Sequence, residues 1–273
     1  MPSILHITDS HLSPHNMLFR DNLALVQAYA RATPHDLVVN SGDLSLNGAD
    51  RDEDLALAAE LHRGFTAPLL ALPGNHDTGT HPTMAPRQPF DSMRMERFRR
   101  HFGPGRGIVD LPGWRVVGLN TEAMGTGHVE EAAQADFIAE AAADAGTRRI
   151  ALFLHKPAYV TVREDPNFDI WSVPPAGRGA LAPLLDHPGL RLVASGHLHL
   201  HHRFTQGKVA YVWAPALSFV VSPGEQVGLP GDRICGALLH RLHEDHVETE
   251  LVVPDGTTIT LIDDVADQTY PRK

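Results

Sequence analysis

Short apolar runs alternate with helix-like segments over the first third of the chain. The runs at residues 3–7, 36–40 and 68–72 are almost continuously apolar, and the segments 16–33 and 52–63 between them have helical spacing. Strands that are apolar on both faces and alternate with helices are typical of a largely parallel sheet covered on both sides. This third therefore predicts parallel strands joined by crossover helices.

The middle of the chain predicts a second group of strands, at residues 114–119, 149–154 and 190–194. Segments 91–101 and 130–144 have helical patterns, and the second carries acidic residues in its first turn, where the helix dipole favours them. Two packed sheets with helices on the outside are the expected architecture.

Two long segments, 78–90 and 161–179, are expected to be loops, the first because it is dense in proline and glycine; a short helix should follow the second. From residue 208 onward, runs of period two predict antiparallel strands: KVAYVW, ICGALLHRL, HVETELVV and TTITLI. The last residues, DDVADQTYPRK, are expected to be unstructured. We therefore predict one domain over residues 1–265 and a flexible tail over residues 266–273.

The composition narrows the classes of function. Apolar residues make up 42% of the chain and charged residues 21%, which is ordinary for a soluble globular protein. With 23 basic and 33 acidic residues the net charge is −10, so neither a nucleic-acid polymer nor an anionic membrane is an expected partner. Because no secretory signal or membrane span is visible, a cytoplasmic location is expected. The single cysteine, Cys235, lies in an apolar run and should be buried.

Five of the predicted strands are followed at once by residues that can bind metal. The sequences after them are TDSH, SGD, PGNHD, HKP and SGHLH, and the candidate ligands are Asp9, His11, Asp43, Asn75, His155, His197 and His199. Since sites in open α/β sheets form outside the carboxyl ends of strands, these residues are expected to meet at one edge. Asp9 and His11, like His197 and His199, are two residues apart, and an extended segment would send both side chains to the same side.

The residue types indicate two metal ions. Two carboxylates, four imidazoles and one amide form a set of oxygen and nitrogen ligands that suits Mn, Fe, Zn or Co. Seven ligands exceed what one ion needs, so two divalent or mixed-valence ions that share a carboxylate and a bridging hydroxide are expected. Each block alone has a structural alternative: Asp9 and Asp43 could cap helices, residues 75–77 could form a turn, and His155 could be a core histidine. All five blocks in this order favour the metal site.

The same residues resemble a known family. The order Asp9-x-His11, Gly42-Asp43, Gly74-Asn75-His76-Asp77, His155 and Gly196-His197-x-His199 resembles the calcineurin-like metallophosphoesterase superfamily over residues 4 to about 215. The resemblance implies an α/β fold, a four-layer α/β/β/α sandwich of two mixed sheets flanked by helices. It also implies that one ion is held by Asp9, His11, Asp43 and His199, and that Asp43 bridges to a second ion held with Asn75, His155 and His197.

The resemblance assigns the catalytic positions as well. It implies that His76 contacts the phosphate and stabilises the developing charge, and that Asp77 orients His76 or supports Asn75. The blocks HITDSHL, LPGNHD and LHKPAY look most like the class III cyclic-nucleotide phosphodiesterases, a group that includes glycerophosphodiesterases. The leading substrate is therefore a small phosphodiester such as a cyclic nucleotide. A glycerophosphodiesterase or a phosphomonoesterase is the alternative, and a scaffold of this fold without catalysis is the alternative from another class.

Several further residues could serve either the site or the fold. Phe168 and Trp171 would either stack on a nucleobase or pin the 161–179 loop to the surface, and pinning is favoured. We expect the other polar candidates to be solvated, to support the ligands or to serve a turn: Lys156, His81, His128, His201 and His202. The antiparallel C-terminal strands offer an edge that could pair between subunits, so a homodimer is preferred.

Overall fold

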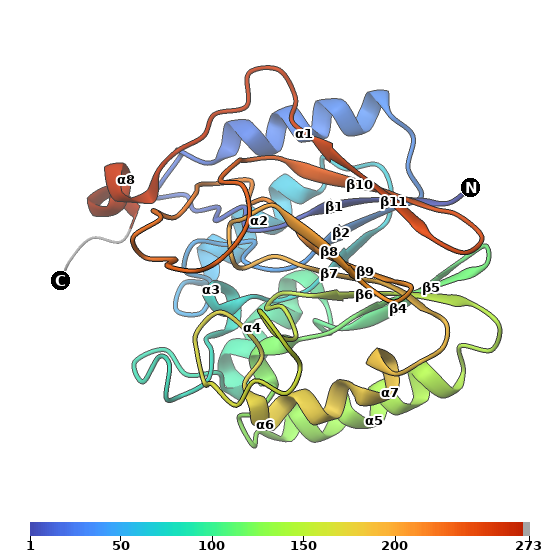
Figure 1. The fold of residues 1–273 in the computed structure, drawn as a ribbon. Coiled ribbons are helices and arrows are strands. Elements are labelled where there is room, and N and C mark those ends of the chain that lie inside the picture. The colour runs from blue at the N-terminus through green and yellow to red at the C-terminus, as the bar shows by residue number, and fades with distance from the viewer. Residues whose placement is uncertain (270–273) are drawn as a thin grey trace.

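Two mixed sheets pack face to face in the computed structural model, which describes residues 1–269 (Figure 1). The first sheet has the order β11 (Val247–Val252), β10 (Ala237–Leu242), β1 (Ser3–Ile7), β2 (Leu37–Asn40) and β3 (Leu69–Ala71). The second has the order β4 (Gly107–Leu111), β5 (Trp114–Gly118), β6 (Arg149–Leu154), β7 (Leu190–Ser195), β9 (Val209–Trp213) and β8 (His202–Gln206).

The central pairs of each sheet are parallel and the outer pairs are antiparallel. Strands β1, β2 and β3 run parallel in one sheet, as do β5, β6, β7 and β9 in the other. The pairs β1–β10, β10–β11, β4–β5 and β8–β9 are antiparallel. The parallel strands therefore direct their carboxyl ends to a common edge in each sheet.

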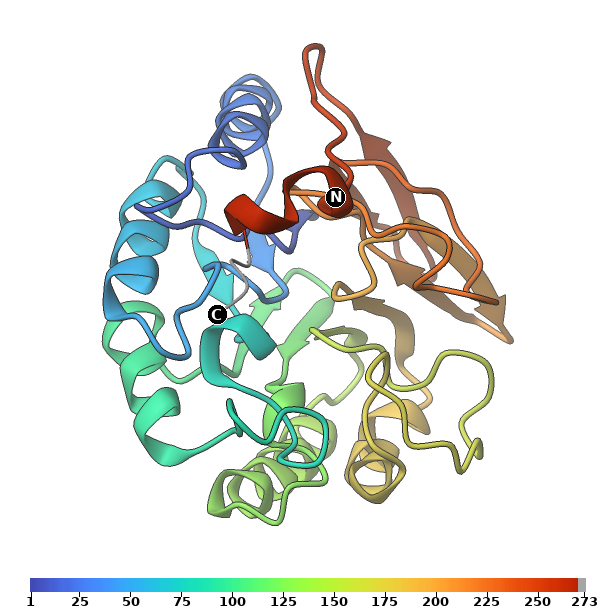
Figure 2. The same cartoon turned by 90° about the vertical axis from the view of Figure 1, so that its left-hand side faces the viewer.

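Helices cover the outer face of both sheets. Against the first sheet lie α1 (Arg20–Ala32), α2 (Asp52–His62) and α4 (Ser92–Phe102), and against the second lie α5 (Val129–Ala143) and α7 (Ala182–Leu185). The short elements are α3 (Asn75–Thr78), η1 (Thr121–Ala123), α6 (Pro175–Arg178) and η2 (Gly179–Leu181), with α8 (Ile262–Thr269) near the C-terminus. Figure 2, which looks onto the carboxyl ends of the parallel strands, shows the sheets between the two helical layers.

Alternate residues of each strand enter different apolar layers. In β1, Leu5 and Ile7 pack under the first helical layer, whereas Ile4 enters the layer between the sheets with Phe153 of β6. Burial on both faces explains why the central strands are continuous apolar runs rather than alternating ones. The four-layer α/β/β/α sandwich implied by the resemblance is confirmed. Among residues 1–269, no helix has the length and hydropathy needed to cross a membrane.

The prediction was wrong for several elements. Strands β4 and β8 were not predicted, and α1 begins at Arg20 rather than at residue 16. The run TTITLI is not a strand, because the Asn22 side chain bonds both backbone polar groups of Thr258 and Val220 bonds the backbone of Thr260 and Ile262. An isolated parallel bridge between Val220 and Leu261 forms there, and the segment joins neither of the two sheets.

The predicted unstructured tail begins with a helix. Residues 262–269 form α8, with Asp263 and Asp264 in its first turn, where the helix dipole stabilises negative charge. The Asn16 side-chain amide also bonds the Gln268 carbonyl oxygen, which ties α8 to the loop after β1. Residues 270–273 of the predicted flexible tail lie outside the described residues.

Candidate metal centre

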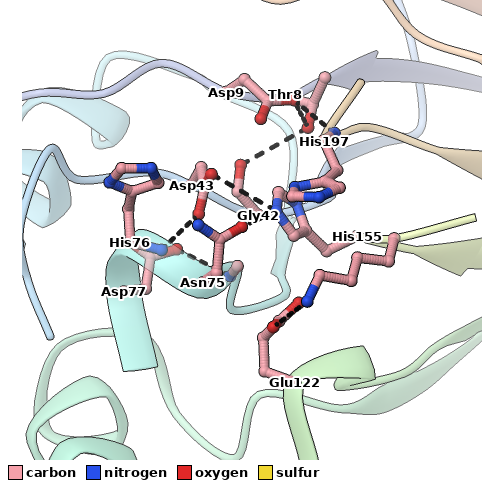
Figure 3. Close-up of polar contacts among 12 residues, drawn as sticks. Thr8, Asp9, Gly42, Asp43, Asn75, His76, Asp77, Glu122, His155 and His197 are labelled. Carbon is pink, nitrogen blue, oxygen red and sulfur yellow. Dashed lines mark hydrogen bonds and ion pairs between the residues drawn. The ribbon is translucent and has the colours of Figure 1, made fainter. Parts of the chain in front are cut away.

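The seven predicted ligands lie together at the carboxyl ends of β1, β2, β3, β6 and β7. Figure 3 shows five of them: Asp9, Asp43, Asn75, His155 and His197. Donor atoms of Asp9, His11 and His199 lie within 4.8 Å of one another, and so do those of Asp43, His155 and His197. Asn75 joins the second group, because its Oδ1 lies 3.2 Å from His155 Nε2. We call these seven residues the rim cluster: Asp9, His11, Asp43, Asn75, His155, His197 and His199.

The backbone of the rim cluster is strained. Among residues 1–269, the non-glycine residues with positive φ are Asp9 (51°), His11 (45°), Asp43 (51°), His197 (69°) and His199 (52°), and all belong to the rim cluster. Such left-handed conformations cost about 1–3 kcal/mol each and cluster at functional sites. The extended backbone expected around Asp9 and His11 is therefore absent, although the side chains do converge. Sharp turns, not strand periodicity, bring them together.

Glycines permit the close approach of these turns. A Cβ atom on Gly74 would lie 2.2 Å from Asp43 Oδ1, and one on Gly42, whose φ is +117°, would lie 2.4 Å from His155 Nδ1. Since real Cβ atoms do not approach other atoms this closely, a side chain at either position would displace a predicted ligand. The glycines in SGD and PGNHD are thus part of the geometry of the site.

In each carboxylate of the rim cluster, one oxygen is held and the other faces the histidines. Asp9 Oδ2 accepts from Thr8 Oγ1 at 2.7 Å and from the His197 backbone N–H at 3.0 Å. Asp43 Oδ1 accepts from the His76 backbone N–H at 2.8 Å, while its Oδ2 lies 3.4 Å from His155 Nε2 and 3.6 Å from His11 Nε2. The second oxygens are therefore fixed in direction before any ligand arrives.

Backbone carbonyls orient the histidine rings in the same way. His155 Nδ1 lies 2.9 Å from the Ser41 oxygen and His199 Nδ1 lies 2.7 Å from the Phe219 oxygen. Each ring thus presents Nε2 to the carboxylates. His197 has the opposite orientation, because its Nε2 lies 2.7 Å from the Ile170 oxygen. Ligating histidines commonly donate their other ring N–H in this manner, which fixes the tautomer.

Burial and charge shift the pKa values of these groups strongly. Burial alone would raise the pKa of the Asp43 carboxyl, but His155 and His76 hold it well below its usual range. Burial would lower the pKa of His155, but Asp43 raises it to about 9. The pKa of His199 is raised by Asp9 against the effect of burial. Burial lowers the pKa of the other two histidines, His11 and His197, the latter to about 3. The carboxylates therefore favour positive charge at His155 and His199 but not at every ring of the cluster.

These residues fit two cations. Asp9 Oδ1 is buried and has no hydrogen-bond partner, although it lies 3.2 Å from His199 Nε2. Ligands about 2.1 Å from one ion and at right angles to each other are about 3.0 Å apart, close to the separations in the rim cluster. Nitrogen and oxygen donors without a thiolate suit transition-metal ions. Asp43 Oδ2 faces a histidine of each group and is the atom in a position to be shared.

His76 and Asp77 differ in what they contact. The His76 Nδ1 lies 2.9 Å from the Leu46 oxygen, and its ring also lies within reach of the His11 and Asp43 donor atoms. Asp77 accepts hydrogen bonds from the backbone N–H groups of Leu44, Ser45 and Gly74. Burial, followed by the charge of Asp43, raises its pKa to about 6. These bonds fit a role for Asp77 in holding the turn before Asn75 rather than in orienting the His76 ring.

The sequence did not predict a buried ion pair beside the rim cluster. Lys156 was expected to be solvated, but it is buried, and its Nζ lies 2.8 Å from Glu122 Oε2 and 2.6 Å from Thr80 Oγ1. Figure 3 shows Glu122 below His155 and His197. Burial would raise the pKa of Glu122, but Lys156 lowers it. No local pattern marks Glu122, because its partner is 34 residues away in the chain.

The remaining candidates lie around this edge. Trp171 packs against Leu198, Leu200 and Trp213, as pinning predicts. Phe168 is 45% exposed and makes an edge-to-face contact with the His81 ring. His128 accepts from the Glu130 N–H at the start of α5, which confirms its turn role. His201 and His202 line a separate depression together with Asp232. Cys235 is buried, as predicted.

Comparison with known proteins agrees with this geometry. The profile of the calcineurin-like phosphoesterase family matches residues 2–201. No curated protein sequence matches the chain. Among solved structures, a dimetal phosphatase from Danio rerio is 14% identical with a TM-score of 0.57, covering 92% of this chain and 96% of that one.

Two further structures share the fold. The purple acid phosphatase PPD1 from yellow lupin (Lupinus luteus) is 14% identical, with a TM-score of 0.64 over 94% of this chain and 52% of that one. GAP50, the anchor in the inner membrane complex of Plasmodium, is 12% identical, with a TM-score of 0.63 over 98% of this chain and 93% of that one. At these identities the likeness establishes the fold alone. The family profile, which covers most of the chain, goes further: this protein belongs to the calcineurin-like phosphoesterase family and is a metal-dependent phosphoester hydrolase.

Proposed function

We propose that the protein hydrolyses small phosphodiesters with two transition-metal ions, and that cyclic nucleotides are the leading substrates. The observation that carries the proposal is Asp43, whose Oδ2 faces His11 on one side and His155 on the other. One ion would be held by Asp9, His11, Asp43 and His199, and the other by Asp43, Asn75, His155 and His197. When bound, such ions supply a nucleophile at neutral pH and positive charge for an in-line displacement.

The substrate would approach from one side of the rim cluster. Asn75, His76 and His197 are partly exposed, whereas Asp9, His11, Asp43, His155 and His199 are buried. A phosphate that reaches the cluster therefore passes the His76 ring. His76, whose Nδ1 is held by the Leu46 oxygen, is placed to donate a hydrogen bond to charge that develops on the leaving oxygen. Its backbone N–H meanwhile holds the shared Asp43.

The charge balance beside the site favours a diester over a monoester. Lys156, the basic residue next to His155, is neutralised by Glu122 and adds no net positive charge. Near neutral pH a diester carries one negative charge and a monoester about two. A monoester would therefore need more positive charge from neighbouring side chains than this side of the site supplies. A glycerophosphodiester meets the same condition as a cyclic nucleotide and is the alternative within this class.

The fold by itself does not distinguish an enzyme from a scaffold, since GAP50 has it and is named as an anchor. The complete ligand set supports the enzyme. A scaffold has no need of five strained backbone positions and a buried carboxylate oxygen without a partner.

A substrate panel tests the proposal. Turnover of cyclic AMP, bis(p-nitrophenyl) phosphate, glycerophosphocholine and p-nitrophenyl phosphate would be measured after reconstitution with Mn, Fe, Zn or Co, with Asp43→Ala as the control. We expect both diester model compounds to be cleaved faster than the monoester, and only by the metal-loaded wild type. Faster cleavage of p-nitrophenyl phosphate would reassign the protein to the phosphomonoesterases. Full activity after rigorous chelation would exclude the metal mechanism.

A further inference from the structure

Two loops stand beside the open side of the rim cluster. The 161–179 loop reaches the cluster directly, because the Ile170 backbone oxygen lies 2.7 Å from His197 Nε2. The 78–90 loop follows α3, which carries Asn75 and His76. His81 of this loop meets Phe168 of the other, with ring centroids 5.0 Å apart and planes at 73°. The two loops therefore join at an aromatic pair whose Phe168 lies two residues before the Ile170 carbonyl that contacts His197.

Both loops are fixed to the sheet beneath them. Trp171 packs against Leu198 and Trp213, which anchors the 161–179 loop three residues after Phe168. The 78–90 loop is held by the bond from Lys156 Nζ to Thr80 Oγ1, one residue before His81. The His81 Nε2 also lies 3.1 Å from the Gly125 oxygen. Anchors on either side of the pair keep Phe168 and His81 in place relative to the rim cluster.

Phe168 leaves much of its ring open to solvent. Its side chain is 45% exposed, although Trp171 in the same loop is largely covered. An edge-to-face contact with His81 occupies one part of the ring and leaves apolar surface uncovered. Structural pinning accounts for Trp171 but gives no reason for a large exposed ring beside His81. A planar group on a bound substrate would cover that surface.

We propose that Phe168, backed by His81, forms a subsite for a flat aromatic or nucleobase group on the phosphoester. The inference rests on the proposed function, because the phosphate must lie at the rim cluster for its substituent to reach this pair. Stacking on an aromatic side chain tolerates different bases, since every base has a π-face. The subsite would therefore select aromatic over alkyl esters while distinguishing little among bases.

A binding comparison that needs no turnover tests the subsite. Phenylphosphonate and methylphosphonate share the anionic group and differ in the substituent, and their affinities for the Mn-loaded protein can be measured by calorimetry. We expect phenylphosphonate to bind about three- to tenfold more tightly to the wild type, as expected for one aromatic contact. Phe168→Ala should bring the two affinities together, and Phe168→Tyr should keep them apart.

Val162→Ala is the matched control, because Val162 lies in the same loop, is 52% exposed and lines a different depression with Leu185 and Tyr211. An unchanged preference in Phe168→Ala, or an equal loss in Val162→Ala, would overturn the subsite and leave the hydrolase proposal standing. If neither phosphonate binds the Mn-loaded wild type, the subsite is overturned, whereas the hydrolase proposal is decided separately by turnover of the diesters in the substrate panel. Binding without turnover of any ester would contradict the proposed function but support the subsite.

Discussion

Two clusters of polar residues in this protein differ in whether all their buried polar atoms have hydrogen-bond partners, because in one of them Asp9 Oδ1 and His11 Nδ1 have none. The first is the rim cluster. The second, which we call the core pair, is His6 and His240, between the sheets. His6 Nε2 lies 2.8 Å from Ser41 Oγ, His6 Nδ1 lies 3.3 Å from His240 Nε2, and His240 Nδ1 lies 2.8 Å from Thr249 Oγ1. Every ring nitrogen of the core pair therefore has a partner.

The electrostatic outcome is mixed in the rim cluster and uniform in the core pair. Burial lowers the pKa of His240 to about 3 and that of His6 well below its usual value, so the core pair is neutral. In the rim cluster, Asp43 raises the pKa of His155 to about 9 and Asp9 raises that of His199, both against burial. Burial still lowers the pKa of His11, and it lowers that of His197 to about 3. Burial alone thus does not make a binding site. An excess of oriented, incompletely paired donor atoms does, and the rim cluster has it at strained backbone positions.

Removing the shared carboxylate should have the largest effect. We expect Asp43→Ala and Asp43→Asn to lower turnover by about 10³-fold or more, because the first removes the oxygen between the two ligand groups and the second removes its negative charge. His240→Gln, in the core pair, should leave turnover within about threefold of the wild type. Reconstitution with Mn should raise the melting temperature of the wild type and of His240→Gln, but much less that of either Asp43 variant. Equal losses of activity in the Asp43 variants and His240→Gln would remove the distinction between the two groups.

Acid should destabilise the protein through the core pair. A histidine whose folded pKa is about 3 and whose unfolded pKa is about 6.5 adds nothing above pH 6.5, and stability is lost as the pH falls toward 3. For His240 the loss between pH 6.5 and pH 4 is about 3 kcal/mol. Urea unfolding of the metal-free protein across this range measures it. His240→Gln should flatten the dependence by about this amount, and an unchanged slope would show that His240 does not titrate on unfolding.

A smaller effect separates chemistry from metal binding within the site. We expect His76→Asn to lower kcat by about 10²-fold, because the ring is placed to stabilise developing charge. Its backbone N–H, which holds Asp43, is kept in the variant. The rise in melting temperature on adding Mn should therefore match that of the wild type. Loss of that rise would instead make His76 a ligand, as its position near His11 and Asp43 also allows.

The sequence predicts those features of the site that depend on local patterns of apolar and polar residues. The position of each ligand after an apolar strand was predicted, since strand ends are visible in the chain and parallel strands share an edge. The left-handed turns at Asp9 and His11 were not, because the expected extended backbone followed from spacing alone. Glu122 was also missed, since its significance depends on Lys156 across the fold.

The fold shows the same division. Central strands and long helices were predicted because burial on one or two faces leaves a periodic pattern. The edge strands β4 and β8 were missed because partial exposure dilutes that pattern, and β8 has the burial of a half-solvated strand. The run TTITLI has strand periodicity, but its backbone groups are bonded to Asn22 and Val220 instead. Tertiary contacts therefore determine whether such a segment forms a strand.

The smallest predicted effect concerns the Glu122–Lys156 pair, which lies beside the rim cluster but is satisfied like the core pair. Glu122→Gln and Lys156→Met should each destabilise the protein, because each leaves a buried charge without its partner. The double variant should recover part of the loss, with a coupling energy of about 2 kcal/mol in urea unfolding. A coupling near zero would mean that the two charges find other partners. If the two charges are coupled and the rise in melting temperature on adding Mn is unchanged, closeness to the rim cluster does not make a charge part of the metal site. The buried Asp9 Oδ1, which has no hydrogen-bond partner, does belong to that site.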